Sequence, residues 1–598
     1  MRRPVNHVWS AVRPVLRLAW RTDRRKLLGG AGLLLGGYLA TPMISLALKG
    51  LIDAALSRAG GPTAWFALAA AALLAAELSL GHFGHLLYFE LGEEEEKSLN
   101  RDIIDIVNGA PGVEHLDSPE FADTLALVRE NLRRTRAIVE AVLQLGGLLV
   151  QAAVSIVILG LLNPWLTLLP VAAVPALLIS RRAQTLVDGA EEQVAQELRR
   201  GRHLLGLATT VGPIRELRLY GAQRRLLSLH HRDWAAASRV LAGAGVRAAA
   251  LRALGQLIFA AAYGGAIALV AAQALHGSSG IGDMVLVISL AAQIGAQVSN
   301  ALTVLGSVQS AGRTFERLEQ LRAWSKVSQR PAATGTAPRS LTGGIRFEQV
   351  GFTYPGTDRP VLEGFDLELP AGRTVALVGE NGAGKSTLVK LLCGLYRPTS
   401  GRILADGRDL AELDPAEWAQ RIAPLFQDFA RLELLLRENV GVGALDAITD
   451  DEVLQAALAA ADARSVVDRV PGGLDGLLGH DYGDGAELSG GQWQKLGLAR
   501  ALVRRDPLLL VLDEPAAALD ASAEHAVFSR FTEAAARRGL ADGAVTLFIS
   551  HRYSTVRDAD LIVVLDDGRI RELGSHDELL AVDGTYADLY RLQASVYR

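Results

Sequence analysis

Long apolar stretches in the first half of this 598-residue chain restrict its fold more than any other feature. A helix needs about 20 mostly apolar residues to cross the hydrocarbon core of a bilayer. Stretches that approach or exceed this length occupy residues 27–48, 64–87, 138–161, 165–179, 251–274 and 284–305. Because lipid offers the backbone no hydrogen-bond partners, such stretches fold as helices. We therefore predict an α-helical polytopic membrane domain with six spans, of which the fourth is short and contains Pro170 and Pro175.

The basic residues around these stretches predict their orientation. Segment 1–26 is rich in arginine, and the long connections after the second and fourth stretches also contain arginine. The connections near 60–61 and 276–280 are short and nearly free of basic residues. Because cytoplasmic loops carry the excess of lysine and arginine, we expect both termini on the cytoplasmic side of a bacterial plasma membrane. Segment 1–26 has the pattern of an amphipathic helix that lies on the membrane surface.

A phosphate-binding loop follows in the second half of the chain. Residues 379–387 read GENGAGKST, directly after the strand-like run 374–378. The glycines let backbone N–H groups point at a phosphate, and the N-terminus of the next helix favours an anion there. Lys385 would reach the β- and γ-phosphates, and the Ser386 hydroxyl would bind Mg²⁺. The residues expected to bind the nucleotide are Gly379, Glu380, Asn381, Gly382, Ala383, Gly384, Lys385, Ser386 and Thr387.

Further motifs flank this loop in a fixed order, and together they resemble the ATP-binding cassette (ABC) family over roughly residues 345–598. They are FTYP at 352–355, FQDF at 426–429, LSGGQ at 488–492, LVLDEP at 510–515, ALD at 518–520 and SHR at 550–552. The resemblance implies an α/β P-loop NTPase cassette domain that binds ATP and Mg²⁺ as cofactors. It also implies a Mg²⁺-dependent ATPase coupled to transport.

The roles that the family gives to these motifs transfer to matching positions. Tyr354 would stack on adenine, and Gln427 would reach Mg²⁺ and the attacking water. Asp513, at the end of an apolar strand, would hold the hydration shell of Mg²⁺, and Glu514 would position and polarise the water. The expected catalytic residues are Glu514, His551 and Lys385, the expected metal ligands are Ser386, Gln427 and Asp513, and Asp520 lies in the expected loop between cassettes.

The LSGGQ motif implies a partner chain. In the family, this signature loop caps the γ-phosphate of ATP held by a second cassette, and its residues here are Leu488, Ser489, Gly490, Gly491 and Gln492. Physically it is another helix N-terminus, because 492–503 reads as a helix. One phosphate loop and one signature loop per chain predict a homodimer with two equivalent sites. A heterodimer with a similar half-transporter is the alternative.

Two segments interrupt the long cytoplasmic connections, near 113–122 and 211–221. Both resemble the coupling helices of ABC exporters, which dock on the nucleotide domain, and two ordinary helical turns are the alternative. The expected organisation is a surface helix at 1–26, a six-span domain at 27–322, a linker at 323–344 and a cassette at 345–598. This order, in which six spans and a linker precede one cassette in the same chain, resembles that of a half-size exporter.

Polar residues within the spans are candidates for contact with cargo. Gln293, Gln297 and Asn300 share one face of a helix by their spacing, and Glu77 lies in the second span. They predict a cavity for a polar or amphipathic molecule. Hydrogen bonds between helices are an equally weighted alternative. For His82 and His85 a position near the cytoplasmic boundary is favoured over a role with cargo.

The resemblance extends to bacterial exporters of peptides, secondary metabolites and drugs. It implies ATP-driven export by alternating access, with the lipid bilayer, a second chain and a small-molecule or peptide cargo as partners. A lipid flippase and an ATP-gated channel or regulatory ABC protein are the alternatives. The net charge of −4 and the lack of a basic tract give no indication of nucleic-acid binding.

Overall fold

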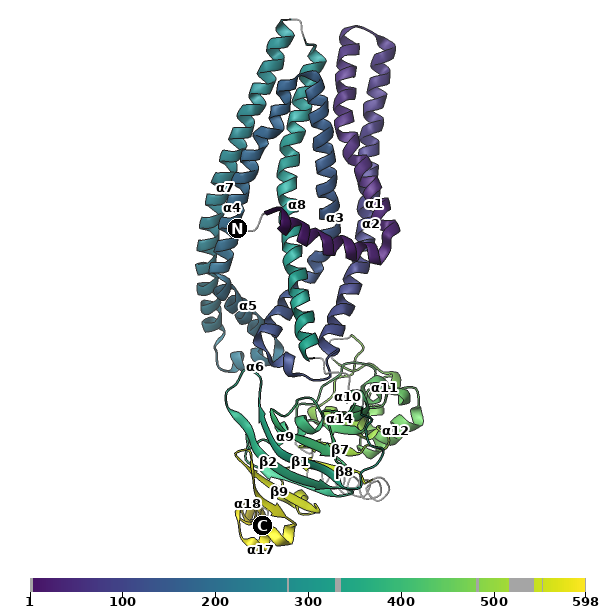
Figure 1. Ribbon diagram of the computed structural model, residues 1–598, viewed down its shortest axis with the longest axis vertical. Coiled ribbons are helices and arrows are strands. Elements are labelled where there is room, and N and C mark those ends of the chain that lie inside the picture. Colours follow the sequence, from purple (N-terminus) through teal and green to yellow (C-terminus); the bar gives the residue numbers. More distant parts are fainter. Residues whose placement is uncertain are drawn as a thin grey trace. The chain divides into compact units, whose positions relative to one another are not determined.

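The computed structural model describes residues 4–276, 279–328, 335–479, 483–515, 543–550 and 552–596 (Figure 1). The chain divides into two compact units. The helical unit comprises residues 1–103 and 126–319, and the cassette unit comprises residues 104–125 and 320–598. The segment 104–125, which connects two long helices, therefore belongs to the cassette unit.

Long helices build the helical unit, which confirms the predicted α-helical membrane domain. They are α1 (Pro4–Leu56), α2 (Gly60–Asn108), α3 (Pro119–Leu162), the 3₁₀ turn η2 (Pro164–Thr167), α4 (Leu168–Gln193), α5 (Ala195–Thr209), α6 (Val211–Leu219), α7 (Gln223–Leu275) and α8 (Ile281–Ser328). Among the described residues, 5 helices are long and apolar enough to cross a membrane. The sixth predicted span falls on α8, where the shorter apolar stretch is Ile281–Gln297.

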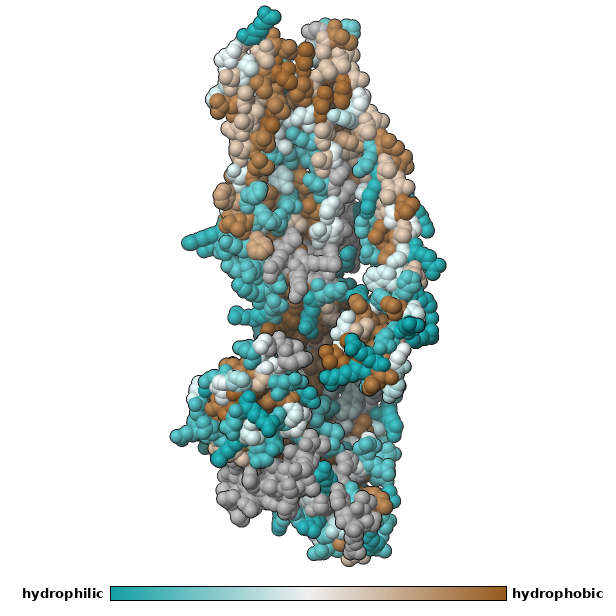
Figure 2. Space-filling model, turned by 180° about the vertical axis from the view of Figure 1, so that it is seen from behind, coloured by the Kyte–Doolittle hydropathy of each residue, from teal (hydrophilic) through white to brown (hydrophobic). Residues whose placement is uncertain are grey.

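The outer surface of these helices is apolar, as expected for helices in contact with lipid. Trp65 and Leu68 of α2 are each 68% exposed, and Leu161 of α3 is 85% exposed. Apolar side chains cover much of the long helices in the upper part of Figure 2. Soluble proteins rarely expose so much contiguous apolar surface.

Helix α1 breaks at Asp23, close to the expected end of the surface helix. The backbone of Asp23 is not helical there (φ −152°, ψ 101°). Its Oδ1 accepts the backbone N–H groups of Arg25 and Lys26 at 2.8 and 3.1 Å, so it caps the helix that follows. The Lys26 ammonium pairs with Glu90 and Glu94 of α2 at 3.1 and 2.8 Å.

Two sheets build the cassette unit, which confirms the α/β prediction. The antiparallel sheet has the order β2 (Pro360–Pro370), β1 (Gly344–Thr353), β4 (Ser400–Ala405), β5 (Arg408–Asp409). The other has the order β10 (Arg569–Gly574), β9 (Leu561–Asp566), β3 (Thr374–Gly379), β8 (Val545–Ile549), β7 (Leu509–Asp513), β6 (Ile422–Leu425). In this six-stranded sheet only the β10–β9 pair is antiparallel. The parallel strands β7 and β8 are buried along their whole length, which explains their continuous apolar sequences.

The cassette unit also contains helices and short turns. They are the 3₁₀ turn η1 (Glu114–Asp117), α9 (Lys385–Leu392), α10 (Pro415–Gln420), α11 (Leu436–Gly441), η3 (Leu445–Ala447), α12 (Asp451–Ala460), α13 (Arg464–Val467), η4 (Gly473–Asp475), α14 (Gly490–Leu502), α16 (Tyr553–Val556), α17 (His576–Val582) and α18 (Thr585–Val596). One apolar core lies between the sheets, with Phe347, Leu388 and Val511 among its members. A second core includes Leu454, Leu496 and Phe548.

The register of the parallel strands brings the key motifs to one edge of the sheet. Strand β8 lies between β3 and β7, with Ile549 paired with Leu377 on one side and with Asp513 on the other. The phosphate loop follows β3, and Glu514 follows β7. Because the carboxyl ends of parallel strands meet at one edge, these segments converge on a single site.

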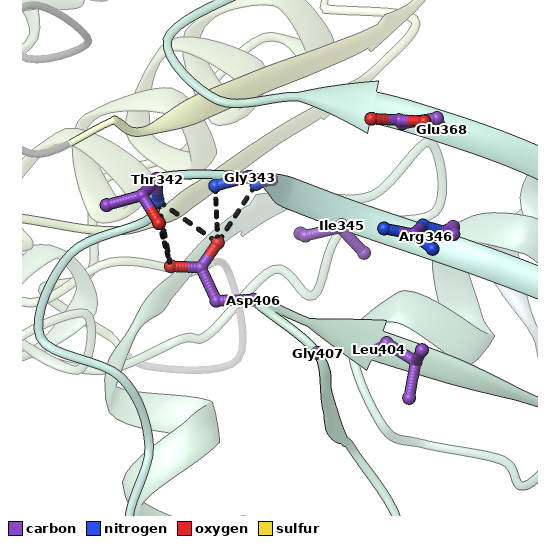
Figure 3. A pocket seen from close by; sticks show the side chains of 9 residues that line it. Thr342, Gly343, Ile345, Arg346, Glu368, Leu404, Asp406 and Gly407 are labelled. Atoms are coloured by element: carbon purple, nitrogen blue, oxygen red, sulfur yellow. Dashed lines mark hydrogen bonds between the residues drawn. The ribbon is translucent and has the colours of Figure 1, made fainter.

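A carboxylate fixes the start of β1 (Figure 3). Asp406, in the turn between β4 and β5, accepts the backbone N–H groups of Thr342 (2.8 Å), Gly343 (2.8 Å) and Gly344 (3.0 Å), and the hydroxyl of Thr342 at 3.1 Å. Burial acts to raise the pKa of Asp406, but these hydrogen bonds outweigh it and lower the pKa from its ordinary value of 3.8. A surface pocket beside the carboxylate is lined by Arg346, Glu368 and Leu404, among others.

We expect Asp406→Asn to destabilise the cassette unit by about 2 kcal/mol at neutral pH, because charge-assisted hydrogen bonds become neutral ones. A carboxyl group whose pKa is lowered by folding stabilises the fold above its ordinary pKa, and this contribution is lost as the pH falls through the folded value. Thermal unfolding followed by tryptophan fluorescence should therefore show a deficit at pH 7 that shrinks below about pH 4.

Asp567→Asn is the matched control for this variant. Asp567 also has a left-handed backbone in a turn between strands (φ 42°, against 47° for Asp406). Its carboxylate is 89% exposed and pairs only with Arg359, at 3.4 Å, among the contacts found in the described residues. Equal unfolding temperatures for the two variants at pH 7 would show that the Asp406 hydrogen bonds do not stabilise the cassette.

Candidate functional site

The phosphate loop has the backbone that its glycines permit. Gly379 ends β3 with φ 150°, and a Cβ atom there would lie 2.2 Å from the carbonyl oxygen of Leu565. Gly384 is left-handed (φ 101°) and immediately precedes α9, which begins at Lys385. A side chain at either position would therefore strain the loop. The first backbone N–H groups of α9 lie at the end of this loop, as an anion site requires.

The Lys385 ammonium lies within the curve of the loop. Its Nζ donates to the carbonyl oxygens of Gly379 and Glu380, both at 2.8 Å. Burial lowers the pKa of Lys385, although the carboxylates of Glu514 and Asp513 oppose the shift. Phosphate oxygens would offer this cation charged acceptors, which form stronger hydrogen bonds than carbonyls do. The position thus suits the predicted contact with phosphates.

Ser386 and Asp513 lie together at the base of the loop. The Ser386 hydroxyl donates to Oδ2 of Asp513 at 3.3 Å, and Asp513 is only 4% exposed. Burial raises the pKa of Asp513 to about 6, and the neighbouring Glu514 adds to this shift. A hydroxyl and a buried carboxylate are hard oxygen ligands, and a carboxylate with a raised pKa lacks full charge compensation. This pair of residues therefore fits a bound Mg²⁺ ion.

Glu514 has an unusual backbone, and hydrogen bonds from other segments hold both its backbone and its side chain. Its φ is 50°, in the left-handed region that glutamate rarely adopts. Its N–H donates to the carbonyl of Ile549 at 3.0 Å, and its own carbonyl accepts from Nε2 of Gln494 at 3.1 Å. Its carboxylate accepts from Nε2 of Gln427 at 2.7 Å. Strained backbone of this kind is concentrated at functional sites.

The role of Gln494 could not be found from the sequence. The residue is 5% exposed and lies on α14, the helix that follows the signature loop. Its side-chain amide donates to the backbone carbonyl of Glu514, which is 20 residues away in the sequence. A glutamine in a helical stretch gives no signal of this partner. The contact links the signature helix directly to the backbone of the candidate catalytic residue.

Tyr354 lies beside the phosphate loop. Its hydroxyl is 3.0 Å from Oγ1 of Thr387, in the first turn of α9. Its ring packs edge-on against Phe352 and Tyr396, with ring centroids 4.8 and 5.4 Å apart. The Lys390 ammonium lies 5.6 Å from the centre of the Tyr354 ring. Stacking of adenine on Tyr354 stays a prediction.

The signature loop forms the N-terminus of α14, which begins at Gly490, two residues before the expected start. Ser489 caps the helix, since the Gln492 N–H donates to its hydroxyl at 3.4 Å and its own N–H donates to Oε1 of Gln492 at 2.9 Å. Gly491 lies in the first turn, and Leu488, just before the cap, is buried. Ser489 and Gly490 are exposed and open to another molecule. Asp520 and His551 lie outside the described residues, and their roles stay predictions.

The structure gives different surroundings to the four polar residues of the predicted cavity, Gln293, Gln297, Asn300 and Glu77. Nε2 of Gln293 donates to Oγ of Ser45 at 3.0 Å, and the Thr41 hydroxyl donates to Oε1 of Glu77 at 2.8 Å. These bonds join α8 to α1 and α1 to α2, as the interhelical alternative expects. Gln297 is 7% exposed, and its amide has no hydrogen-bond partner among the described residues. Asn300 is exposed. A contact with cargo stays a prediction for all four residues.

Known proteins resemble this chain in sequence. The family model described as ABC transporter matches residues 362–517. An ATP-dependent lipid A-core flippase of Chromobacterium violaceum is 33% identical over 443 residues, which is 73% of this chain and 72% of that protein. The same-named protein of Chromohalobacter salexigens is 37% identical over 56% of each chain. The human mitochondrial potassium channel ATP-binding subunit is 34% identical over 74% of this chain and 59% of its own length.

The fold also resembles a solved structure over nearly its whole length. A bacterial Atm1-family ABC exporter with ATP bound matches with a TM-score of 0.75 and 25% sequence identity. The match covers 96% of this chain and 98% of the exporter chain.

We expect Gln494→Ala to lower kcat for ATP hydrolysis about tenfold and to leave KM within about twofold, because a displaced general base slows chemistry more than it weakens binding. Steady-state ATPase assays on the purified full chain measure both constants. Gln420→Ala, at the exposed end of α10, is the control. If kcat is unchanged in a Gln494→Ala protein that unfolds at the normal temperature, the contact with Glu514 does not position the carboxylate.

Proposed function

This chain belongs to the ABC transporter family as a half-size exporter, and from this premise we propose that two copies move an amphipathic cargo out of the cytoplasm by alternating access. The chain is a multi-pass membrane protein whose ATP-binding domain couples ATP hydrolysis to transport. The main support for the proposal is that the likeness to an exporter structure extends over 96% of the chain.

We infer that the nucleotide site uses its own residues in the following way. Lys385 exchanges the carbonyls of Gly379 and Glu380 for phosphate oxygens, and the N-terminus of α9 adds N–H donors. Ser386 and Asp513 would hold Mg²⁺, which when bound neutralises charge on the phosphates. Glu514, fixed by its backbone contacts, orients the attacking water.

We propose that the hydrogen bond between Gln427 and Glu514 belongs to a resting form of the site. The Gln427 amide now donates to the Glu514 carboxylate at 2.7 Å, which occupies an oxygen that the water would need. The family role of Gln427 lies at Mg²⁺. A move of this amide toward the metal would release the carboxylate, so that nucleotide binding prepares the general base. We also propose that Asp520 contacts the partner cassette and that His551 contacts the γ-phosphate.

A second chain is proposed because one chain leaves its signature loop open. Ser489 and Gly490 are exposed at the N-terminus of α14, where the helix dipole favours an anion. The γ-phosphate of ATP on a partner chain would meet that requirement. A homodimer completes two equivalent sites in this way, and a heterodimer with a similar half-transporter remains the alternative.

The orientation and the membrane are also proposals. We propose that both termini and the cassette lie in the cytoplasm of a bacterial cell, and the arginine-rich segment 1–26 and the arginine-bearing connections support this orientation. We propose the domain limits expected from the sequence, namely a surface helix to 26, spans to 322, a linker to 344 and the cassette to 598, with the connection 104–125 grouped with the cassette unit.

The proposed cargo is amphipathic, such as a peptide, a secondary metabolite or a drug. The support is the set of polar side chains in apolar helices, above all the buried Gln297 amide, which has no hydrogen-bond partner among the described residues. Lipid flipping is the second candidate, because several relatives bear the name lipid A-core flippase. The name of the human relative supports the channel-associated alternative less strongly, since it describes a subunit.

Reconstituted vesicles separate these functions. The purified chain is placed in liposomes with labelled phospholipid and with a panel of fluorescent peptides and drugs, and ATP is added outside. We expect ATP-dependent accumulation of an amphipathic probe. Movement of labelled lipid alone would favour the flippase, and ATP-gated potassium conductance without accumulation would refute export.

Glu514→Gln should bind ATP with an affinity close to that of the unmodified chain but hydrolyse it at least 100-fold more slowly, since general-base catalysis contributes about 10²–10⁴-fold. Fluorescent-nucleotide titration and phosphate release measure the two effects. Glu363→Gln, which removes an exposed surface carboxylate, is the control and should hydrolyse normally. Normal turnover in Glu514→Gln would remove this residue from the catalytic set.

A further inference from the structure

The connection between α2 and α3 is fastened to the cassette by its own side chains and backbone. The Val113 N–H donates to the carbonyl of Leu395 at 3.0 Å. The Tyr396 hydroxyl donates to Oδ2 of Asp117 at 2.5 Å, at the end of η1. Val113 also packs against the core between the two sheets. The connection is thus attached at two points to one short stretch of the same unit, residues 395–396.

Tyr396 also contacts the residues that surround the phosphate loop. The residue is 5% exposed, and its ring lies edge-on to Tyr354 with centroids 5.4 Å apart and an interplanar angle of 83°. The Tyr354 hydroxyl is 3.0 Å from that of Thr387, which is buried in α9. Direct contacts therefore run from α9 through Tyr354 and Tyr396 to Asp117. We refer to these side chains, Thr387, Tyr354, Tyr396 and Asp117, as the tyrosine path.

The charges along the tyrosine path favour its present arrangement. Burial raises the pKa of Tyr396, and the Asp117 carboxylate raises it further, so the phenol keeps its proton and stays a donor at physiological pH. The Lys390 ammonium, on α9, lies 5.6 Å from the centre of the Tyr354 ring and 5.9 Å from that of Tyr396. A cation at these distances is attracted to both rings. Helix α9 thus supplies Thr387 to the path and also contacts its two tyrosine rings through Lys390.

We propose that Tyr396 is a positioning residue that transmits nucleotide occupancy of the cassette to the α2–α3 connection of the same chain. The inference rests on the proposed ATP site at the phosphate loop. A base stacked on Tyr354, or phosphates drawn to the start of α9, acts on groups that pack directly on Tyr396. Because packed side chains do not deform freely, a shift of Tyr354 moves Tyr396 and changes its bond to Asp117. By reciprocity, a change at Asp117 alters the nucleotide affinity.

Hydrogen–deuterium exchange on the full chain in lipid nanodiscs tests this transmission. Glu514→Gln serves as the parent, so that Mg·ATP binds without turnover. We expect ATP to protect residues 379–387 and also to change exchange in residues 111–121. Tyr396→Phe keeps the ring and its packing but lacks the hydroxyl. It should retain the protection of 379–387 and lose at least half of the change in 111–121.

A second variant and a control separate transmission from simple stability. Asp117→Ala removes the acceptor at the other end of the bond and should give the same loss, and the double variant should lose no more than either single one. Tyr586→Phe also removes a buried tyrosine hydroxyl, which lies 2.8 Å from Nδ1 of His576, and should leave the response of 111–121 intact.

The outcomes distinguish the two claims. If ATP protects 379–387 and the response of 111–121 is the same in Tyr396→Phe as in the parent, the tyrosine path does not transmit occupancy and only this inference is wrong. If ATP protects 379–387 in no variant, the proposed nucleotide site is wrong and the inference falls with it.

Discussion

The candidate nucleotide site depends on a carboxylate that is buried away from water. Asp513 is 4% exposed at the end of β7, and burial raises its pKa to about 6, so at neutral pH it is an ionised group with incomplete compensation. The nearby Lys385 is bonded to two carbonyls, and Ser386 offers only a hydroxyl. Buried charge without a full partner is unfavourable. Binding of a metal–nucleotide complex would relieve this cost, and under the proposed function the relief would supply free energy for a conformational change.

Local pattern was enough to predict the strand–loop–helix around Lys385, because glycine positions and an apolar strand determine that geometry. The sequence also predicted long apolar helices, since about 20 apolar residues have one solution in lipid, and 5 described helices are long and apolar enough to cross a membrane where six spans were predicted. It could not predict contacts between distant residues. The bond from Tyr396 to Asp117 joins positions 279 apart, and Gln494 reaches Glu514 through a buried amide that no motif marks. The start of α14 at Gly490 depends on the Ser489 cap, which the expected start at 492 overlooked.

Polar side chains in the helical unit form hydrogen bonds between helices, one of the two roles that their spacing in the sequence allowed. Gln293 bonds to Ser45, and Glu77 accepts from Thr41, so both side chains hold neighbouring helices together. Such bonds have modest strength in membranes, and helices joined by them can separate and re-pair at low cost. Gln297 differs, because its buried amide has no partner in the described part of the chain. A site that changes its access across the membrane needs both properties: bonds that re-form and a polar group that remains available.

Sharing of each nucleotide site between two chains is tested most directly by counting chains. The protein can be placed in nanodiscs that hold either one chain or two, sorted by mass, and its ATP hydrolysis measured per chain. If a partner's exposed Ser489 and Gly490 complete the site, two-chain discs should hydrolyse ATP at least tenfold faster per chain than one-chain discs. Equal rates per chain would contradict a shared site, because a single phosphate loop would then work without a partner's signature loop.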